Sequence, residues 1–366
     1  MKQPEKRITD LDSLVEELPP EERELAGRLF EMVPAVGRME VPDGMRGWVE
    51  KTFGSVEAVL EQRIMRITDR ITLEGTLFNE LRASRPFDAG GGSLSLKEGI
   101  ESTKGDPFCR PEEGTPEDVF GRVRGKHCTT ASNVAKYDGF HGLIVFDEHD
   151  PLAFDVEKVV DYVSVALEWL RKAQETDPEA RYPFLMWNCL WRAGSSVVHG
   201  HAQVTAARGA HYPKVERLRR AAVAYAAEYG TDYFSDLYKV HEALGLAIET
   251  SPEIARAQVS GFVSLTPAKE KEIVLFGPNL GEPLRRLLAD VLMRYTKHVG
   301  VSSFNVAFYM PPAPPSEEDW SRFPTVVRLV DRGDPGNRTS DIGAMELYAV
   351  PVVSSDPFQV ARFLRG

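Results

Sequence analysis

The expected secondary structure of this 366-residue chain follows one order twice. In the first half, apolar β-type runs at 142–146, 184–191 and 201–207 surround a helix expected over 156–173, where apolar residues recur every three or four positions. In the second half, further β-type runs surround a helix expected over 282–298. This repeated order of strands, one long helix and further strands predicts an α+β fold. We expect two similar halves, each an antiparallel sheet with packed helices.

The first part of the chain differs from these halves. Residues 1–72 carry helix-spaced apolar positions, so we expect a helical N-terminal extension that packs on subunits or is exchanged between them. The first half is then expected over 73–230 and the second over 231–366. The length leaves room for two domains or for one duplicated domain.

Composition limits the classes of partner. A formal net charge of −11 at pH 7 argues against a broad nucleic-acid-binding surface, so an anionic substrate would need a local cluster of Arg or Lys. The 3 cysteines do not suggest a disulfide scaffold. The N-terminus has no signal-peptide pattern, and no apolar run approaches the roughly 18 residues of a membrane span. We therefore expect a cytoplasmic protein that binds neither nucleic acid nor membrane.

The string GSSVVHGHAQV contains the polar residues that are the strongest candidates for a functional site. His199, His201 and Gln203 are spaced two apart, which in a strand would place them on one face. The alternative is an exposed amphipathic strand with incidental histidines. The preceding small-residue turn, Gly194–Ser196, offers N–H groups and hydroxyls for phosphate oxygens, or is a plain β-turn.

The pattern from Asn188 to Gln203 resembles the active-site segment of the histidine-triad superfamily. It is most similar to the branch of galactose-1-phosphate uridylyltransferase and the nucleotide phosphorylases, where Gln replaces the third His. The resemblance implies that His201 attacks the α-phosphorus of a nucleotide, while Gln203 and Ser196 donate hydrogen bonds to phosphate oxygens. It further implies substrate contacts from Asn188, Gly194 and Ser195.

Other segments resemble the same branch. LRASRPF looks like its Arg-x-x-Arg-Pro segment, which makes Arg82 and Arg85 candidate phosphate ligands; without the resemblance they read as a solvated surface pair. On the same match Asn133 would contact the nucleoside. Glu346 would hold a sugar hydroxyl, or is an exposed strand residue. The segment 340–346 lacks the Lys and Tyr of the uridylyltransferase pattern, which argues against galactose as the sugar.

A metal site is also implied by the resemblance. DPFC stands where the uridylyltransferase has a zinc-binding Cys-x-x-Cys, so Cys109 would bind a structural zinc with His149 and His199, and with Asp106 in place of the other Cys. In the alternative, no metal is bound and His199 only orients its neighbours. Five further histidines are interpreted as surface or packing residues: His127, His141, His211, His241 and His298.

The resemblance implies a nucleotidyltransferase that moves a nucleoside monophosphate between a nucleotide sugar and a sugar 1-phosphate. One alternative is a phosphorylase or adenylyltransferase that splits a dinucleoside polyphosphate or nucleotide sugar with inorganic phosphate. Another, suggested by the altered second half, is a nucleotide-binding protein without turnover. Gln203 offers no second acid–base group and so disfavours a hydrolase. The branch also suggests a homodimer.

Overall fold

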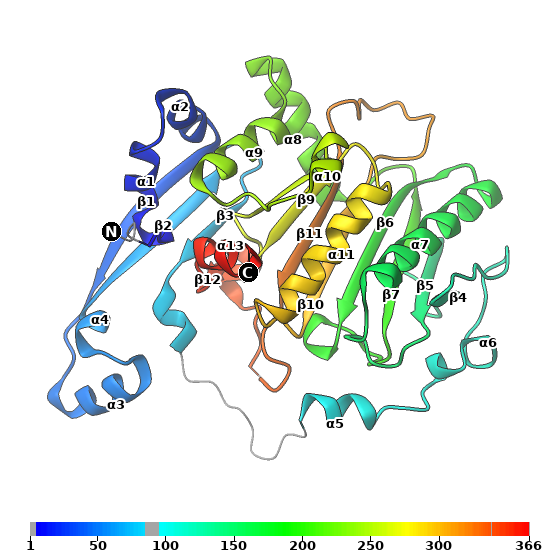
Figure 1. Cartoon of the computed structure of the whole chain (residues 1–366), viewed down its shortest axis with the longest axis horizontal. Helices are drawn as coiled ribbons and strands as arrows, with labels where there is room; N and C mark the ends of the chain where they lie inside the picture. Colours follow the sequence, from blue (N-terminus) through cyan, green and yellow to red (C-terminus); the bar gives the residue numbers. More distant parts are fainter. Residues whose placement is uncertain (1–4, 85–94, 338, 366) are drawn as a thin grey trace.

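The computed structural model describes residues 5–84, 95–337 and 339–365, so the expected phosphate ligand Arg85 lies outside the described residues. Its centre is an eight-stranded sheet of order β4-β5-β7-β6-β10-β11-β9-β8 (Figure 1). Every neighbouring pair in it is antiparallel. The strands are β4 (Cys128–Ser132), β5 (Phe140–Phe146), β6 (Ala180–Cys189), β7 (His201–Arg208), β8 (Ser260–Val263), β9 (Ile273–Gly277), β10 (Phe304–Tyr309) and β11 (Thr325–Asp331).

The α+β prediction is confirmed, and the two expected halves share one sheet. The first half supplies β4 to β7 and the second supplies β8 to β11. They meet where β6 pairs with β10, from Phe304 opposite Cys189 to Tyr309 opposite Phe184. Because this pairing satisfies the backbone groups of both edges, neither half ends in an open edge at the junction.

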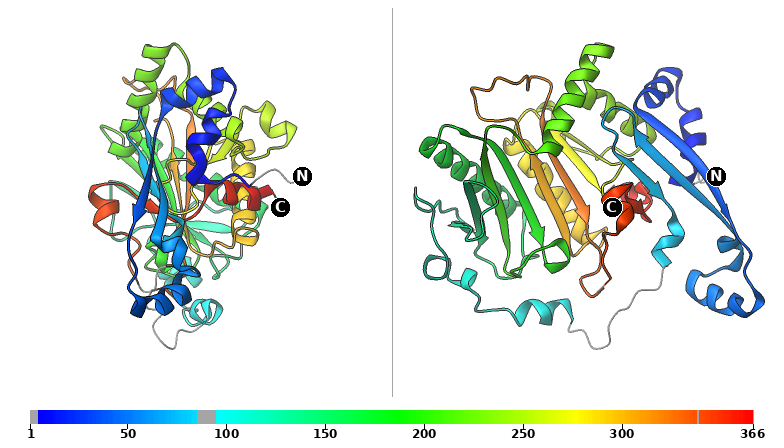
Figure 2. Two further views of the ribbon diagram at one scale, coloured as in Figure 1. Left: turned by 90° about the vertical axis from the view of Figure 1, so that its left-hand side faces the viewer. Right: turned by 180° about the vertical axis from the view of Figure 1, so that it is seen from behind.

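Two long helices cover one face of this sheet. α7 (Val156–Thr176) and α11 (Glu282–Lys297) pack side by side, on the near face in Figure 1 and behind the strands in the reverse view of Figure 2. Asp155 caps α7 by accepting the N–H of Lys158, and the buried residues of α7 recur every three or four positions. Ala202 of β7 lies against α7, so the neighbouring His201 and Gln203 belong to the opposite face.

The expectation of a purely helical N-terminal extension is wrong. Between its helices the segment contains two long strands, β1 (Phe30–Arg38) and β2 (Glu61–Asp69), in a second sheet of order β1-β2-β3-β12. The signal that was missed is the alternation in β2, where Met65, Ile67 and Asp69 are buried in turn. β3 (Gly75–Phe78) and β12 (Val352–Val353) join this sheet, which therefore takes strands from all three expected segments.

The remaining elements are short or peripheral. The α-helices are α1 (Leu11–Glu16), α2 (Pro20–Leu29), α3 (Asp43–Phe53), α4 (Val56–Leu60), α5 (Leu96–Glu101), α6 (Pro111–Gly114), α8 (Pro213–Tyr229), α9 (Tyr233–Leu244), α10 (Pro252–Arg256), α12 (Ala344–Tyr348) and α13 (Pro357–Arg365). The 3₁₀ turns are η1 (Ile8–Asp10), η2 (Glu80–Ser84), η3 (Pro107–Cys109) and η4 (Trp191–Ala193). Across the described ranges, no helix combines the length and the apolar character needed to span a bilayer.

Candidate active site and metal-ligand cluster

His201 is the first residue of β7 and is held in one tautomer. Its Nδ1 lies 2.9 Å from the carbonyl oxygen of His199, so Nδ1 carries the proton and donates it. The lone pair is therefore on Nε2, at the other side of the ring. Burial lowers the pKa of His201, and the edge-to-face ring of Phe108 lies 5.1 Å from its ring. The geometry presents a neutral imidazole with one nitrogen available as a nucleophile.

His199 does not belong to the strand that the sequence predicted. β7 begins only at His201, so His199 lies in the loop before it. There the backbone turns toward the end of β5: the N–H of Phe146 bonds to the carbonyl of Gly200, and the N–H of Gly200 bonds to the carbonyl of His149. A Cβ at Gly200 would lie 2.6 Å from Cδ2 of Phe146. Glycine at this position therefore permits the close approach of the loop to β5.

Gln203 occupies the middle of β7, opposite Leu143 of β5 and Met186 of β6. Its Oε1 lies 2.9 Å from Nε2 of His141, a fully buried residue of β5. Sequence reasoning assigned no site role to His141. Sequence spacing alone gave no sign of this contact, because it joins residues that are 62 positions apart.

Asn133 lies beside this pair, directly after β4. Its Oδ1 accepts the N–H of Ala135 at 2.9 Å, and its Nδ2 lies 3.2 Å from Nε2 of His141. Asn133 thus shapes the turn that leads into β5 and reaches the surroundings of Gln203. Its expected contact with a nucleoside stays a prediction.

The small-residue turn expected to hold phosphate lies between η4 and His199. Gly194 has φ +91°, a left-handed conformation that favours glycine. Ser195 is buried and donates its hydroxyl to the carbonyl of Val197, whereas Ser196 is exposed. Of the two serine hydroxyls, that of Ser196 is therefore the one placed to meet a ligand.

The second half supports this turn through Asn305 of β10. The amide of Asn305 donates to Oδ1 of Asn188 at 2.7 Å and to the carbonyl of Ala193 at 2.8 Å. Its own Oδ1 accepts from Arg332 at 2.6 Å, and Arg332 pairs with Asp341 at 2.8 Å. The side chain of Asn188 thus accepts from the same amide that bonds Ala193, and its expected contact with substrate stays a prediction. Neither residue was identified from the sequence, because Asn305 meets Asn188 and Ala193 of the other half, and Arg332 reaches Asn305 only through the folding of its loop.

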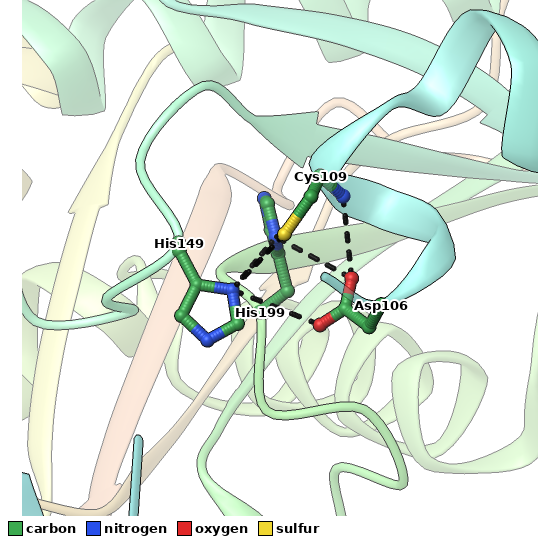
Figure 3. Close-up of side chains that lie close together, drawn as sticks. All are labelled: Asp106, Cys109, His149 and His199. Atoms are coloured by element: carbon green, nitrogen blue, oxygen red, sulfur yellow. Dashed lines mark hydrogen bonds and ion pairs between the residues drawn. The ribbon is translucent and has the colours of Figure 1, made fainter. Parts of the chain in front are cut away.

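The four expected metal ligands come together as one cluster. Figure 3 shows the side chains of Asp106, Cys109, His149 and His199 close together. One ligand atom from each lies within 4.8 Å of every other. Sγ of Cys109 is 3.4 Å from Nδ1 of His149 and 3.5 Å from Nδ1 of His199. A zinc ion with N ligands at 2.0–2.1 Å and an S ligand at 2.3 Å separates its tetrahedral ligands by about 3.3–3.6 Å. The cluster therefore has the dimensions of a zinc site.

The protonation of the two rings agrees with a metal. Nε2 of His199 donates to the carbonyl of Phe146 at 2.8 Å, and Nε2 of His149 lies 3.0 Å from the carbonyl of Ile100. Both Nδ1 atoms are then unprotonated, and they lie 3.2 Å apart. Burial lowers the pKa of His199, which keeps its lone pair free. A ligating histidine whose other nitrogen donates to a backbone carbonyl is the usual arrangement around zinc.

Asp106 completes the donor set. Its Oδ1 accepts the N–H groups of Phe108 and Cys109, while its buried Oδ2 has no hydrogen-bond partner in the described chain. Sγ of Cys109 accepts the N–H of Gly105 at 3.3 Å, which suits a thiolate. A buried carboxylate oxygen without a donor, beside two nitrogen lone pairs, is costly unless a cation is bound. The residues present thus fit zinc.

The described chain does not bring Arg82 or Glu346 to this site. Arg82 lies on η2, where it lines an apolar pocket with residues of the N-terminal sheet and its helices. This sheet adjoins the β8 end of the large sheet, whereas β7 lies toward the other end (Figures 1 and 2). Glu346 lies on α12, a helix where a strand was expected, and it accepts the N–H of Gly343 at 2.8 Å. This hydrogen bond, within the first turn of α12, favours the helix locally.

The arrangement of two halves that share one sheet, with a His-x-His-x-Gln segment entering a central strand, is a fold that this chain shares with several solved structures. Among solved structures, the chain is similar to an ADP-glucose phosphorylase from Arabidopsis thaliana with bound ADP-glucose, with a TM-score of 0.60 and 17% identity over 82% of this chain and 98% of that one. A GalT-like protein from Arabidopsis thaliana gives 0.56 and 16%, over 72% and 92% of the two chains. A uridylyltransferase gives 0.55 and 15%, over 82% and 96%. The amino-acid sequence matches no family model and no curated protein sequence.

Proposed function

We propose that this protein is a nucleotidyltransferase that works through a covalent nucleotidyl-histidine. The observation that carries the proposal is the hydrogen bond from Nδ1 of His201 to the carbonyl of His199, which leaves the Nε2 lone pair for attack. In the first step Nε2 forms a bond to the α-phosphorus, and the bond from phosphorus to the leaving phosphate oxygen breaks. In the second step an acceptor phosphate oxygen attacks the same phosphorus and the N–P bond breaks.

The residues around His201 support both steps by binding oxygen. The amide N–H of Gln203 and the hydroxyl of exposed Ser196 would donate to phosphate oxygens, where negative charge builds in the transition state. Asn305 supports the turn that carries Ser196, because its amide donates to the carbonyl of Ala193, directly before that turn. Fixed donors are worth more than mobile ones, because they need no reorganisation when the charge develops.

The metal cluster has a structural part in this proposal. Asp106, Cys109, His149 and His199 would hold zinc, which would tie the loop of η3 to the segment just before β7. Phe108 of that loop packs edge-on against the His201 ring, so fixing the loop also limits the orientations of the nucleophile.

The nucleotide donor we propose is a nucleotide sugar and the acceptor a sugar 1-phosphate. One observation favours inorganic phosphate as the acceptor instead: the Glu346 carboxylate, expected to hold a sugar hydroxyl, already accepts the N–H of Gly343 in its own helix. We further propose a homodimer, in which Arg82 of one copy, on η2 next to the smaller sheet, would reach a phosphate bound at β7 of the other copy.

Intact-mass spectrometry after incubation with ADP-glucose, UDP-glucose and a dinucleoside polyphosphate tests the proposal. The wild-type protein should gain one nucleoside monophosphate, and His201→Ala should gain none. Discharge of the isolated adduct by glucose 1-phosphate identifies a transferase, and discharge by inorganic phosphate alone identifies a phosphorylase. Tight nucleotide binding without any adduct would instead indicate a binding protein without turnover.

A further inference from the structure

We propose that His141 is a positioning residue that fixes the side-chain amide of Gln203 with its NH₂ group directed at the bound phosphate. The phosphate in this statement rests on the function proposed above. The orientation of the amide does not, because it follows from hydrogen bonds within β5, β7 and the turn between β4 and β5.

The backbone sets the tautomer of His141. The N–H of Tyr137 donates to Nδ1 of His141 at 3.0 Å, and a backbone N–H can only be a donor. Nδ1 is therefore the acceptor. A neutral imidazole then has its proton on Nε2, and burial, which lowers the pKa of His141, favours this neutral form.

The proton on Nε2 has one acceptor within reach. Oε1 of Gln203 lies at 2.9 Å. Nδ2 of Asn133 lies at 3.2 Å, but the Oδ1 of Asn133 accepts from Ala135, so the Asn133 nitrogen that faces the ring is itself a donor. The bond from His141 thus ends on the oxygen of Gln203.

An amide whose oxygen is engaged presents its nitrogen on the other side. Within the described residues, the nitrogen of Gln203 has no hydrogen-bond partner, although Gln203 is only 8% exposed. A rotated amide would face a phosphate oxygen with its own oxygen, which is repulsive, and would set two donors against each other at His141. His141 therefore selects the one orientation that helps a phosphate, and donation into Oε1 also polarises the N–H groups.

The ring of His141 is itself fixed. It is fully buried, and the ring of Tyr137 stacks on it at 4.5 Å with an interplanar angle of 27°. A rotamer change would break the bond from Tyr137 and bury an unpaired nitrogen. The orientation of Gln203 is thus inherited from the backbone of the turn at 133–139 rather than from a mobile side chain.

The test is a double-mutant cycle on adduct formation. His141→Leu removes the donor with similar volume, and His141→Gln places an amide donor near the position of Nε2; each is made with Gln203 and with Gln203→Ala. His141→Leu should slow adduct formation by about tenfold to a hundredfold, part of the roughly 10²–10³ that one oxyanion donor contributes. His141→Gln should recover most of this rate. In the Gln203→Ala background, His141→Leu should change nothing further.

Equal slowing by His141→Leu in both backgrounds would overturn the inference, because it would show a structural role. Failure of His141→Gln to recover the rate would overturn it too. Long-range ¹⁵N–¹H spectra of the wild-type protein, with the His141 signals assigned by their loss in His141→Gln, give a readout without activity. They should show protonated Nε2 and bare Nδ1; the opposite tautomer refutes the inference even if His141→Leu does not fold. If the wild-type protein forms no adduct, the proposed function is refuted. The spectrum would still decide the tautomer of His141, because it does not depend on activity.

Discussion

The Nδ1 atoms of His149 and His199 lie 3.2 Å apart, and each ring has its other nitrogen at a backbone carbonyl. Two lone pairs at this distance repel unless a proton or a cation lies between them. Cys109 and Asp106 add a sulfur atom and a carboxylate to the same cluster. The pair is thus the clearest sign of a cation in the described chain.

Purified protein should therefore contain about one zinc per chain by elemental analysis. Cys109→Ser should lose most of this metal, since a hydroxyl is a much poorer ligand than a thiolate. Cys128→Ser is the matched control and should keep the metal, because Cys128 lies in β4, outside the cluster. Purified wild-type protein that contains no zinc, and whose melting temperature does not change when a chelator is added, would contradict the prediction.

Gly200→Ala should destabilise the protein by about 1–3 kcal/mol, the usual cost of forcing a methyl group into a packed site. The added Cβ would meet Phe146 at 2.6 Å and the backbone of Pro151 at 3.2 Å, and the backbone cannot move away cheaply. Urea unfolding measures the change. Gly27→Ala is the control: a Cβ there meets nothing within 4 Å, and replacing a helical glycine should be neutral or stabilising by about 0.5–1 kcal/mol.

Asn305→Ala should reduce both stability and adduct formation. It leaves the Oδ1 of Asn188 and the carbonyl of Ala193 without their donor, at a cost of about 1–3 kcal/mol. The rate should fall because the turn of Ser196 loses its support, and thermal melts with adduct kinetics measure both effects. Ser302→Ala, whose side chain has no hydrogen bond in the described part of the chain, should change neither. Full activity in Asn305→Ala would show that the turn needs no support from the second half.

Acid should destabilise the fold through His211 and His241. Burial lowers the pKa of each to about 4. In the unfolded chain both titrate near 6.5, so below about pH 6.5 the unfolded state binds more protons and the free energy of unfolding falls, until pH 4 is passed. Urea unfolding at pH 7.5, 6 and 5 should show this loss. His211→Asn should make stability less steeply pH-dependent than the exposed control His298→Gln does.

The sequence predicted what depends on local pattern. The helices of α7 and α11 follow from apolar residues repeated every three or four positions, and the structure places them within a few residues of the expected bounds. The metal cluster was predicted through resemblance, and its four side chains do converge. In contrast, the strand character of β1 and β2 is specified by their pairing with each other, from Phe30 opposite Asp69 to Arg38 opposite Glu61. Helix-like spacing in the neighbouring residues concealed it.

Contacts between distant segments explain the other omissions. His141 reaches Gln203 only because β5 and β7 are neighbours in the sheet, and Arg332 reaches Asn305 only because its loop folds back on β10. No spacing in the sequence encodes either contact. Arg82 was likewise assigned to the phosphate site from a motif. A motif identifies the side chains that are present, but it does not predict where the fold places them, which here is beside the smaller sheet.

The pairing of β6 with β10 also shows how the second half supports the proposed active site of the first half. Without β10, β6 would be an edge strand with unpaired backbone N–H and C=O groups. Such a strand can shift its pairing register or associate with other chains. Asn188, near the end of β6, would lose the hydrogen bond from Asn305. The second half therefore fixes the register of β6 through its pairing with β10. Because the two halves share one sheet, we expect them to unfold together in a single transition.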